Sequence, residues 1–179
     1  MAVAINSDTL HPKSFVETNT YFINENHTVA LVSICGDQVD DLLNGSFLEP
    51  YTSTAYFSPD GVFRTEATGF SNKHGNDSWA YTPRGIDFVG DDQYGINFGL
   101  RYKLFHRKDR DEFQRIIFKA AANDNYPAES DGAHIRDAYV QTLSQYSKLN
   151  MDERTYEPCI LYMNGQYWGV YEIREKVDD

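Results

Sequence analysis

The sequence predicts an α+β protein in which strands dominate, with a mostly antiparallel sheet and one main helix. Two observations support this class. Short apolar runs rich in β-branched and aromatic residues recur between turn signals, and only one stretch shows a clear helical period. With 179 residues, of which 41% are hydrophobic and 15% aromatic, the chain is long enough to bury the core of one folded domain.

The expected strands follow in order along the chain. Four runs indicate single strands: 20–24, 28–36, 84–90 and 114–122. A hairpin is expected over 54–67, because Ser-Pro-Asp-Gly places Pro at the second turn position and Gly where a positive φ is needed. Residues 40–50 are expected to form a loop with a helical turn, and 97–105 fit no single type.

The main helix is expected at residues 132–148, with Ser130 or Asp131 as its cap. Six side chains recur on one face of it at a period of 3.6: Ile135, Ala138, Tyr139, Thr142, Leu143 and Tyr146.

A second hairpin gives the strongest local signal, CILYMNGQYWGVYEI at 159–173. Two apolar strands flank Asn164-Gly165, the pair that best suits a type I′ turn. The hairpin runs directly into REKVDD at the end of the chain, and this ending predicts the front part of a larger domain.

At this hairpin the sequence resembles the CotH family, named for a bacterial spore coat protein. YMNGQYWGVYEIREKVDD (162–179) is close to the family's hairpin signature, and KAAANDN (119–125) and HIRDAYVQTL (134–143) resemble a strand end and a helix that precede it. HGNDSWAYTPRGIDF (74–88) resembles the family's "rGnsSw…pKksfrikf" segment, and TYFINENHTVALVSICGD (20–37) its lead-in strands. The resemblance implies lead-in strands and a loop at 1–50, and at 51–179 the N-terminal part of a distant kinase-like domain.

The resemblance also implies a secreted atypical protein kinase of the cell envelope that uses ATP with Mg²⁺ or Mn²⁺ to phosphorylate a Ser or Thr of a surface protein. Gly75, Asn76, Ser78 and Trp79 would then form a loop that covers the nucleotide phosphates with backbone N–H groups. The cation that follows, Arg84, would neutralise phosphate charge.

Two further candidates follow from the resemblance. Glu175 is the expected carboxylate partner of the loop cation, and Lys103 is a second choice for the cation itself. No catalytic residue is assigned, because the family's catalytic and metal-binding aspartates are expected beyond the hairpin. This fragment would therefore be inactive alone.

One departure from the family pattern bears on activity. The family has lysine after the loop proline, whereas this chain has Arg84, whose planar guanidinium differs in geometry from an ammonium. A pseudokinase scaffold is therefore one alternative. Another is an acidic, aromatic-rich, non-catalytic module that binds carbohydrate or another envelope component by stacking of exposed Tyr and Trp side chains. This alternative predicts that Trp79 and Trp168 lie on one exposed, flat face.

Charge and cysteine content narrow the remaining choices. The net charge of −11, with Lys and Arg spread along the chain, argues against nucleic acid, and no apolar run is long enough for a membrane span. Cys35 and Cys159 match no metal motif and are expected to be free thiols, although a disulfide between them stays open. No metal site is assigned within the chain.

Asp124 is expected to have a structural role in a turn, and Asp137 to serve the helix dipole or an internal ion pair.

Overall fold

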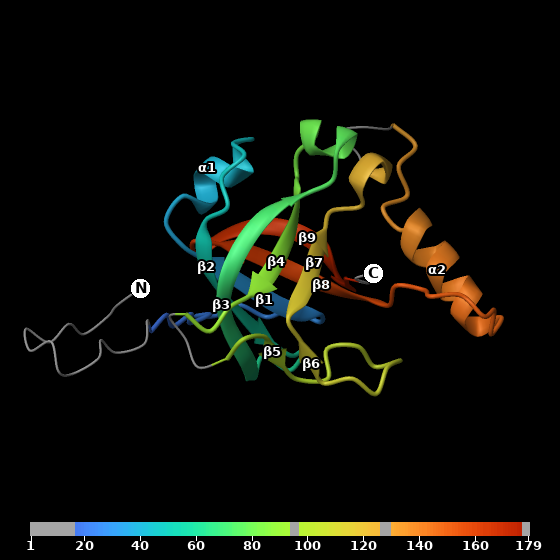
Figure 1. Ribbon diagram of the computed structural model, residues 1–179, viewed down its shortest axis with the longest axis horizontal. Helices are drawn as coiled ribbons and strands as arrows, with labels where there is room; N and C mark the ends of the chain where they lie inside the picture. The colour runs from blue at the N-terminus through green and yellow to red at the C-terminus, as the bar shows by residue number, and fades with distance from the viewer. Residues whose placement is uncertain (1–16, 94–96, 126–129, 177–179) are drawn as a thin grey trace, which may run out of the picture.

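The computed structural model describes residues 17–93, 97–125 and 130–176, in which strands dominate as predicted (Figure 1). The elements are β1 (Ala30–Cys35), α1 (Val39–Leu43), β2 (Tyr51–Phe57), β3 (Phe63–His74), β4 (Gly85–Gly90), β5 (Leu100–Arg101), β6 (Glu112–Phe113), β7 (Arg115–Lys119), α2 (Arg136–Tyr146), β8 (Tyr156–Met163) and β9 (Gln166–Glu175). Two short 3₁₀ helices, η1 (Asp77–Ala80) and η2 (Ala122–Asp124), complete the described secondary structure.

Seven of the described strands close into a barrel in the order β1-β2-β3-β4-β7-β9-β8. Every neighbouring pair is antiparallel except β1 and β8, which run parallel and close the barrel. Because β1 pairs with both β2 and β8, residues 30–35 belong to the same barrel as the later strands, whereas β5 and β6 form a separate two-stranded sheet.

Both predicted turns are confirmed. Asn164 and Gly165 have φ of 47° and 79°, as a type I′ turn requires between β8 and β9. Gly61 has a φ of 76° and donates its N–H to the Ser58 carbonyl oxygen at 2.8 Å, which closes the β2–β3 turn. The residue types at these two turns are therefore sufficient to specify the hairpins.

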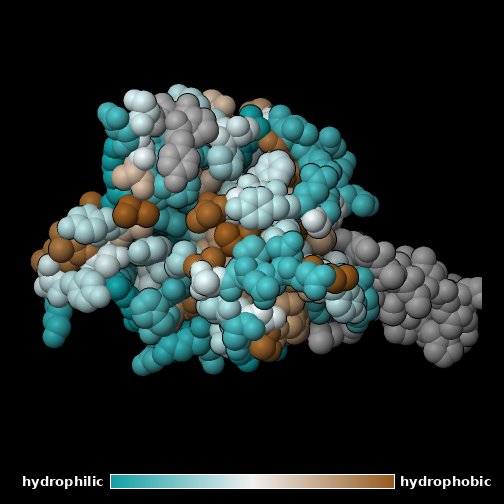
Figure 2. All heavy atoms as spheres, turned by 180° about the vertical axis from the view of Figure 1, so that it is seen from behind, coloured by the Kyte–Doolittle hydropathy of each residue, from teal (hydrophilic) through white to brown (hydrophobic). Residues whose placement is uncertain are grey.

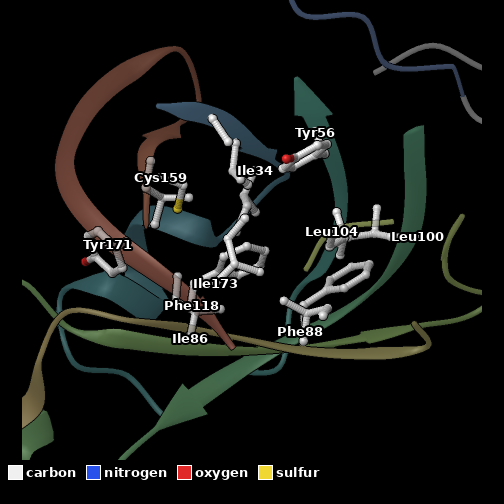
Figure 3. Packing of buried hydrophobic residues seen from close by; sticks show 14 of the residues in the cluster. Ile34, Tyr56, Ile86, Phe88, Leu100, Leu104, Phe118, Cys159, Tyr171 and Ile173 are labelled. Carbon is white, nitrogen blue, oxygen red and sulfur yellow. The ribbon is translucent and has the colours of Figure 1, made fainter. Parts of the chain in front are cut away.

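The barrel interior is filled by apolar side chains that alternate along the strands. Figure 3 shows how side chains from opposite walls meet in it; the labelled ones are Ile34, Tyr56, Ile86, Phe88, Leu100, Leu104, Phe118, Cys159, Tyr171 and Ile173. Burial raises the pKa of the Cys159 thiol well above its usual range. Cys35 and Cys159 are both free, as predicted, but Cys35 is only half-buried.

One predicted strand is corrected, and the untyped stretch at 97–105 is now assigned. Residues 20–24 form no strand; they pass as an irregular strap over a second, smaller cluster on the outside of the barrel, where Phe22 packs against Phe57 and Tyr162. The apolar side chains of this run are buried by packing on the outer cluster, so the run does not need to pair as a strand. Of the 97–105 stretch, only Leu100–Arg101 is extended enough to pair.

The predicted helix is present, but it is shorter than the expected range of 132–148. The helix α2 begins at Arg136, and its N-cap position is Ile135 without a side-chain cap. Its predicted apolar face is largely exposed: only Ala138 is buried, whereas Tyr139, Leu143 and Tyr146 are 61%, 51% and 72% exposed. Figure 1 shows α2 standing away from the barrel, and the apolar residues at the left edge of Figure 2 lie on this side of the molecule.

No helix among the described residues is long and apolar enough to cross a membrane.

Candidate functional site

The loop between β3 and β4 has a compact, well-defined backbone conformation. Gly75 has a φ of 117°, and a Cβ there would lie 2.4 Å from Ser78 Oγ, so the backbone path requires glycine. The loop continues through η1, where Trp79 N–H donates to the Asn76 carbonyl at 3.2 Å, and Thr82-Pro83 is a cis peptide. At the top of Figure 1 this loop lies beside η2, which it contacts.

Arg84 anchors this loop. Its Nε donates to the Trp79 carbonyl at 2.7 Å, its Nη1 donates to the Leu43 carbonyl, and its guanidinium lies 5.6 Å from the centre of the Trp79 ring. Tyr171 on β9 supports the same point by donating to the Arg84 carbonyl at 2.8 Å. The arginine is thus engaged in holding the loop to the end of α1, and its contact with phosphate stays a prediction.

Glu175 and Lys103 lie away from the loop. The buried Glu175 carboxylate lies between Lys108 and Arg110 of the β5–β6 connection, and its Oε1 is 3.0 Å from Arg110 Nη1. Lys103 pairs with the exposed Asp109 at 2.9 Å. The structure therefore brings together Gly75, Asn76, Ser78, Trp79 and Arg84 in one loop, and it does not bring Glu175 to them.

A different set of charged side chains lies beside the loop, on the outer face of β4, β7 and β9. We call it the outer-face network; it comprises Asp87, Arg115, Lys119, Asp137, Glu172, Arg174 and Lys176. Strand alternation places these strand residues opposite the apolar core, and helix α2 contributes Asp137.

The central contact of the network joins a strand to the helix that follows it. Lys119 Nζ pairs with Asp137 Oδ2, and the same oxygen accepts from Arg174 Nη1 at 2.6 Å. Although burial acts to raise it, the pKa of Asp137 is held below its usual range by the bond from Lys119 and the charge of Arg174. The carboxylate is therefore ionised at neutral pH and holds Lys119 in a fixed position.

Lys119 lies at the loop end of its strand. Phe118 pairs with Ile86, so Lys119 is level with Gly85, where β4 leaves the loop. His74, at the other side of the loop, is close enough to Lys119 and Asp87 for their charges to act on it. Burial lowers the pKa of His74 to about 4, so the imidazole is neutral at neutral pH.

Two buried oxygens of the network have no hydrogen-bond partner in the structure. Asp87 Oδ1 is unpaired while Oδ2 accepts from Arg115 at 3.2 Å, and Glu172 Oε1 is unpaired while Oε2 accepts from Arg174 at 2.8 and 2.9 Å. Burial raises the pKa of Glu172, and the Arg174 charge opposes that rise. Although the chain has a net charge of −11, four cations, Arg115, Lys119, Arg174 and Lys176, lie close together among the described residues of this face.

Asp124 has the structural role that was predicted for it. It also takes the place of the residues expected to cap α2. Its Oδ1 and Oδ2 accept the N–H groups of Ala133 and Arg136 at 2.8 and 2.9 Å, so Asp124 fixes the entry to α2 instead of Ser130 or Asp131. Burial acts to raise the pKa of Asp124, but these bonds hold it below its usual range.

The two tryptophans do not form an exposed stacking face. Trp79 is buried, with 6% of its surface exposed, and Trp168 is partly buried and packs against the barrel core. The flat face of two exposed tryptophans that the alternative of a carbohydrate-binding module predicts is therefore not present.

Sequence reasoning missed Lys119, although the signal was present. The residue ends a buried strand immediately before the helix that carries Asp137, and strand alternation puts it on the face opposite Phe118. A strand lysine paired with a carboxylate on the next helix, beside a loop that joins two strands, is the arrangement by which protein kinases hold phosphate groups.

Comparison with protein families agrees with this class. The family model described as CotH kinase protein matches residues 94–179, which include β5 to β9 and α2. Residues 94–179 are thus similar to the CotH kinase protein family, and the resemblance noted in the sequence is confirmed over these residues. No curated protein matches the chain.

Proposed function

We propose that this chain provides the nucleotide-binding part of a CotH-type protein kinase, which transfers phosphate from ATP to a Ser or Thr of a surface or envelope protein. The observation that carries the proposal is the Lys119–Asp137 pair, which links the end of β7 to the following helix beside the β3–β4 loop. The match of residues 94–179 to the CotH kinase protein family model supports it independently.

In this proposal the loop covers the phosphates and Lys119 neutralises them. Gly75, Asn76, Ser78 and Trp79 supply the cover, with backbone N–H groups directed at phosphate oxygens. Lys119 acts as the strand lysine and Asp137 keeps it in position. Arg84 anchors the cover; direct contact between Arg84 and phosphate, and a nucleotide role for Glu175, are retained as secondary proposals.

The clustered cations of the outer-face network fit a polyphosphate, whereas the metal is implied by the family alone. Within residues 17–93, 97–125 and 130–176 no group of three or more His, Cys, Asp or Glu side chains is placed to hold a metal ion. Mg²⁺ or Mn²⁺ would supply further charge neutralisation at the phosphates. No catalytic residue is assigned to the described part, and secretion, the division of the chain near residue 50 and the location of the catalytic aspartates beyond the hairpin remain part of the proposal.

The test is ATP binding by calorimetry, with and without Mg²⁺ or Mn²⁺, on the wild-type chain and on four variants, of which Arg84→Ala is the fourth. Lys119→Met should weaken binding by about tenfold to a hundredfold, because a charge-assisted contact is lost. Asp137→Asn should weaken it less, since Lys119 is kept but no longer fixed. Lys103→Met is the matched control, because Lys103 is a lysine that the structure pairs away from the loop.

Equal affinity of wild type and Lys119→Met would refute the assignment of Lys119. If Arg84→Ala instead abolished binding with a folded loop, the phosphate contact would belong to Arg84. Metal-dependent binding without any phosphate transfer by the whole protein would indicate the pseudokinase alternative.

A further inference from the structure

A hollow of about 580 Å³ lies at the opposite end of β3 from the nucleotide loop. The strap at residues 19–23 forms one wall, and the β2–β3 hairpin forms the other. Its apolar lining includes Phe22, Ile23, Ala55, Phe57 and Phe63, and Glu66 contributes the carboxylate among the described lining residues. Eight residues separate Glu66 from His74 along the strand, which corresponds to about 25 Å.

The aromatic wall of this hollow is fixed by its own packing. The Phe22 ring packs edge-on against Phe57 and Tyr162, with 5.1 Å and 4.8 Å between ring centres. The ring centres of Phe57 and Phe63 are 5.5 Å apart. Thr20 Oγ1 donates to Ser33 Oγ at 2.9 Å and ties the strap to the barrel. The hollow is therefore formed before any ligand arrives, which reduces the ordering cost of binding.

Glu66 places a carboxylate in this apolar setting, and no described residue supplies its counter-charge. The carboxylate is half-buried, and none of the described residues forms an ion pair with it. The nearest cation along the strand, Arg64, is bound to Asp60 at 2.8 Å and Ser58 at 2.7 Å. Burial, and then the charge of Glu17, raise the pKa of Glu66.

We propose that this hollow binds the cationic side chain of a lysine or arginine from an extended segment of a partner protein. The methylene groups of such a side chain fit an aromatic wall, its charge is attracted by the ring faces, and its ammonium or guanidinium supplies the counter-charge that Glu66 lacks. The net charge of −11 favours approach by a basic segment. The site does not depend on the proposed nucleotide function, because the two lie at opposite ends of β3.

The test uses three probes on the full chain. The tripeptide acetyl-Leu-Lys-Val-amide carries the cation, the same peptide with norleucine in place of lysine keeps an uncharged stem of similar length, and spermidine is a free polyamine. Binding is measured by calorimetry or NMR titration for wild type, Glu66→Gln and Asp40→Asn. Asp40 is an exposed carboxylate on α1 and serves as the matched control.

The lysine peptide should bind wild type about tenfold more tightly than the norleucine peptide, and Glu66→Gln should remove that difference. Asp40→Asn should leave it unchanged. In the absence of peptide, Glu66→Gln should also raise the melting temperature, because it removes a charge whose ionisation burial disfavours. A purely structural role for Glu66 would lower it.

Equal binding of the two peptides, absence of binding, or an unchanged preference in Glu66→Gln would overturn the proposal. Tighter binding of spermidine than of the lysine peptide would overturn the assignment to a partner protein and identify a free polyamine as the ligand.

Discussion

The two faces of the sheet formed by β4, β7 and β9 differ completely in chemistry although they are built by the same strands. Ile86, Phe118 and Ile173 alternate into the barrel, and each is at most 1% exposed. Lys119 and Glu172 alternate outward with the rest of the outer-face network, where burial is offset by ion pairs. The inner face stabilises the fold by removing apolar surface from water. On the outer face, ion pairs must compensate the free-energy cost of removing charges from water.

This difference indicates what each face is for. Apolar packing stabilises the barrel regardless of which partner residue is present at each position, so long as volume is kept. A buried charge network contributes little net stability and fails when one partner is removed. Its retention on the face beside the β3–β4 loop agrees with a role in binding anions.

The largest expected effect is on the inner face. Phe118→Ala removes a fully buried ring and should lower the free energy of unfolding by about 3–5 kcal/mol, measured by urea denaturation. Phe47→Ala is the control, because that ring is 76% exposed and its loss should cost no more than about 1 kcal/mol. Equal costs for the two variants would contradict the assignment of the barrel interior as the core.

The next effect is on the outer face. Arg174→Met leaves Glu172 buried without its cation and should cost about 3 kcal/mol, whereas the double variant Arg174→Met with Glu172→Met should recover most of that loss. Urea denaturation of the single and double variants measures both. If the double variant were no more stable than Arg174→Met, the network would be contributing by packing instead of charge compensation.

A smaller effect concerns pH. The pKa of His74 is lowered by burial to about 4, below the value of about 6.5 in the unfolded chain, so between these values the unfolded state binds the extra proton. This contribution to stability is complete above pH 6.5 and is lost as pH falls towards 4. Between pH 7.5 and 5, wild type should lose about 1–2 kcal/mol more than His74→Gln in urea denaturation. An identical pH profile for the two would show that His74 is solvated.

The smallest effect is expected on the exposed face of α2. Leu143→Ser should change the free energy of unfolding by no more than about 0.5 kcal/mol, because Leu143 is 51% exposed and the barrel does not cover it. A loss of about 2 kcal/mol or more would mean that this face is buried in solution.

Local signals predicted the hairpins well and the helix face poorly. The Asn164-Gly165 turn and the Gly61 turn depend on φ values that the residues themselves favour, so the hairpins follow from sequence. The period of α2 was correct, but period alone does not state which surface covers a face. Likewise the apolar run at 20–24 indicated burial and not the kind of element, because Phe22 is satisfied by packing on the outside of the barrel.

The candidate site was predicted only in part, because sequence motifs show neighbours along the chain but not contacts between distant residues. The loop with Gly75 and Trp79 is contiguous in sequence and could be recognised there. The Lys119–Asp137 pair joins residues 18 apart, and Arg174 reaches the same carboxylate from 37 residues away, so only the packing of α2 against the outer face of the sheet reveals it. Arg84 and Glu175 were chosen as a pair by analogy, and folding directs them to different partners.

By itself the sequence determined the strand-dominated class, the two tight turns and the resemblance of residues 94–179 to a known family. Each of these depends on local dihedral preference, on alternation within one strand, or on a contiguous motif. The tertiary structure alone decided that the sheet closes through the parallel β1–β8 pair, that Asp124 caps α2, and which cation faces which carboxylate. These outcomes depend on contacts between distant segments, whose free energies exist only once the chain has folded.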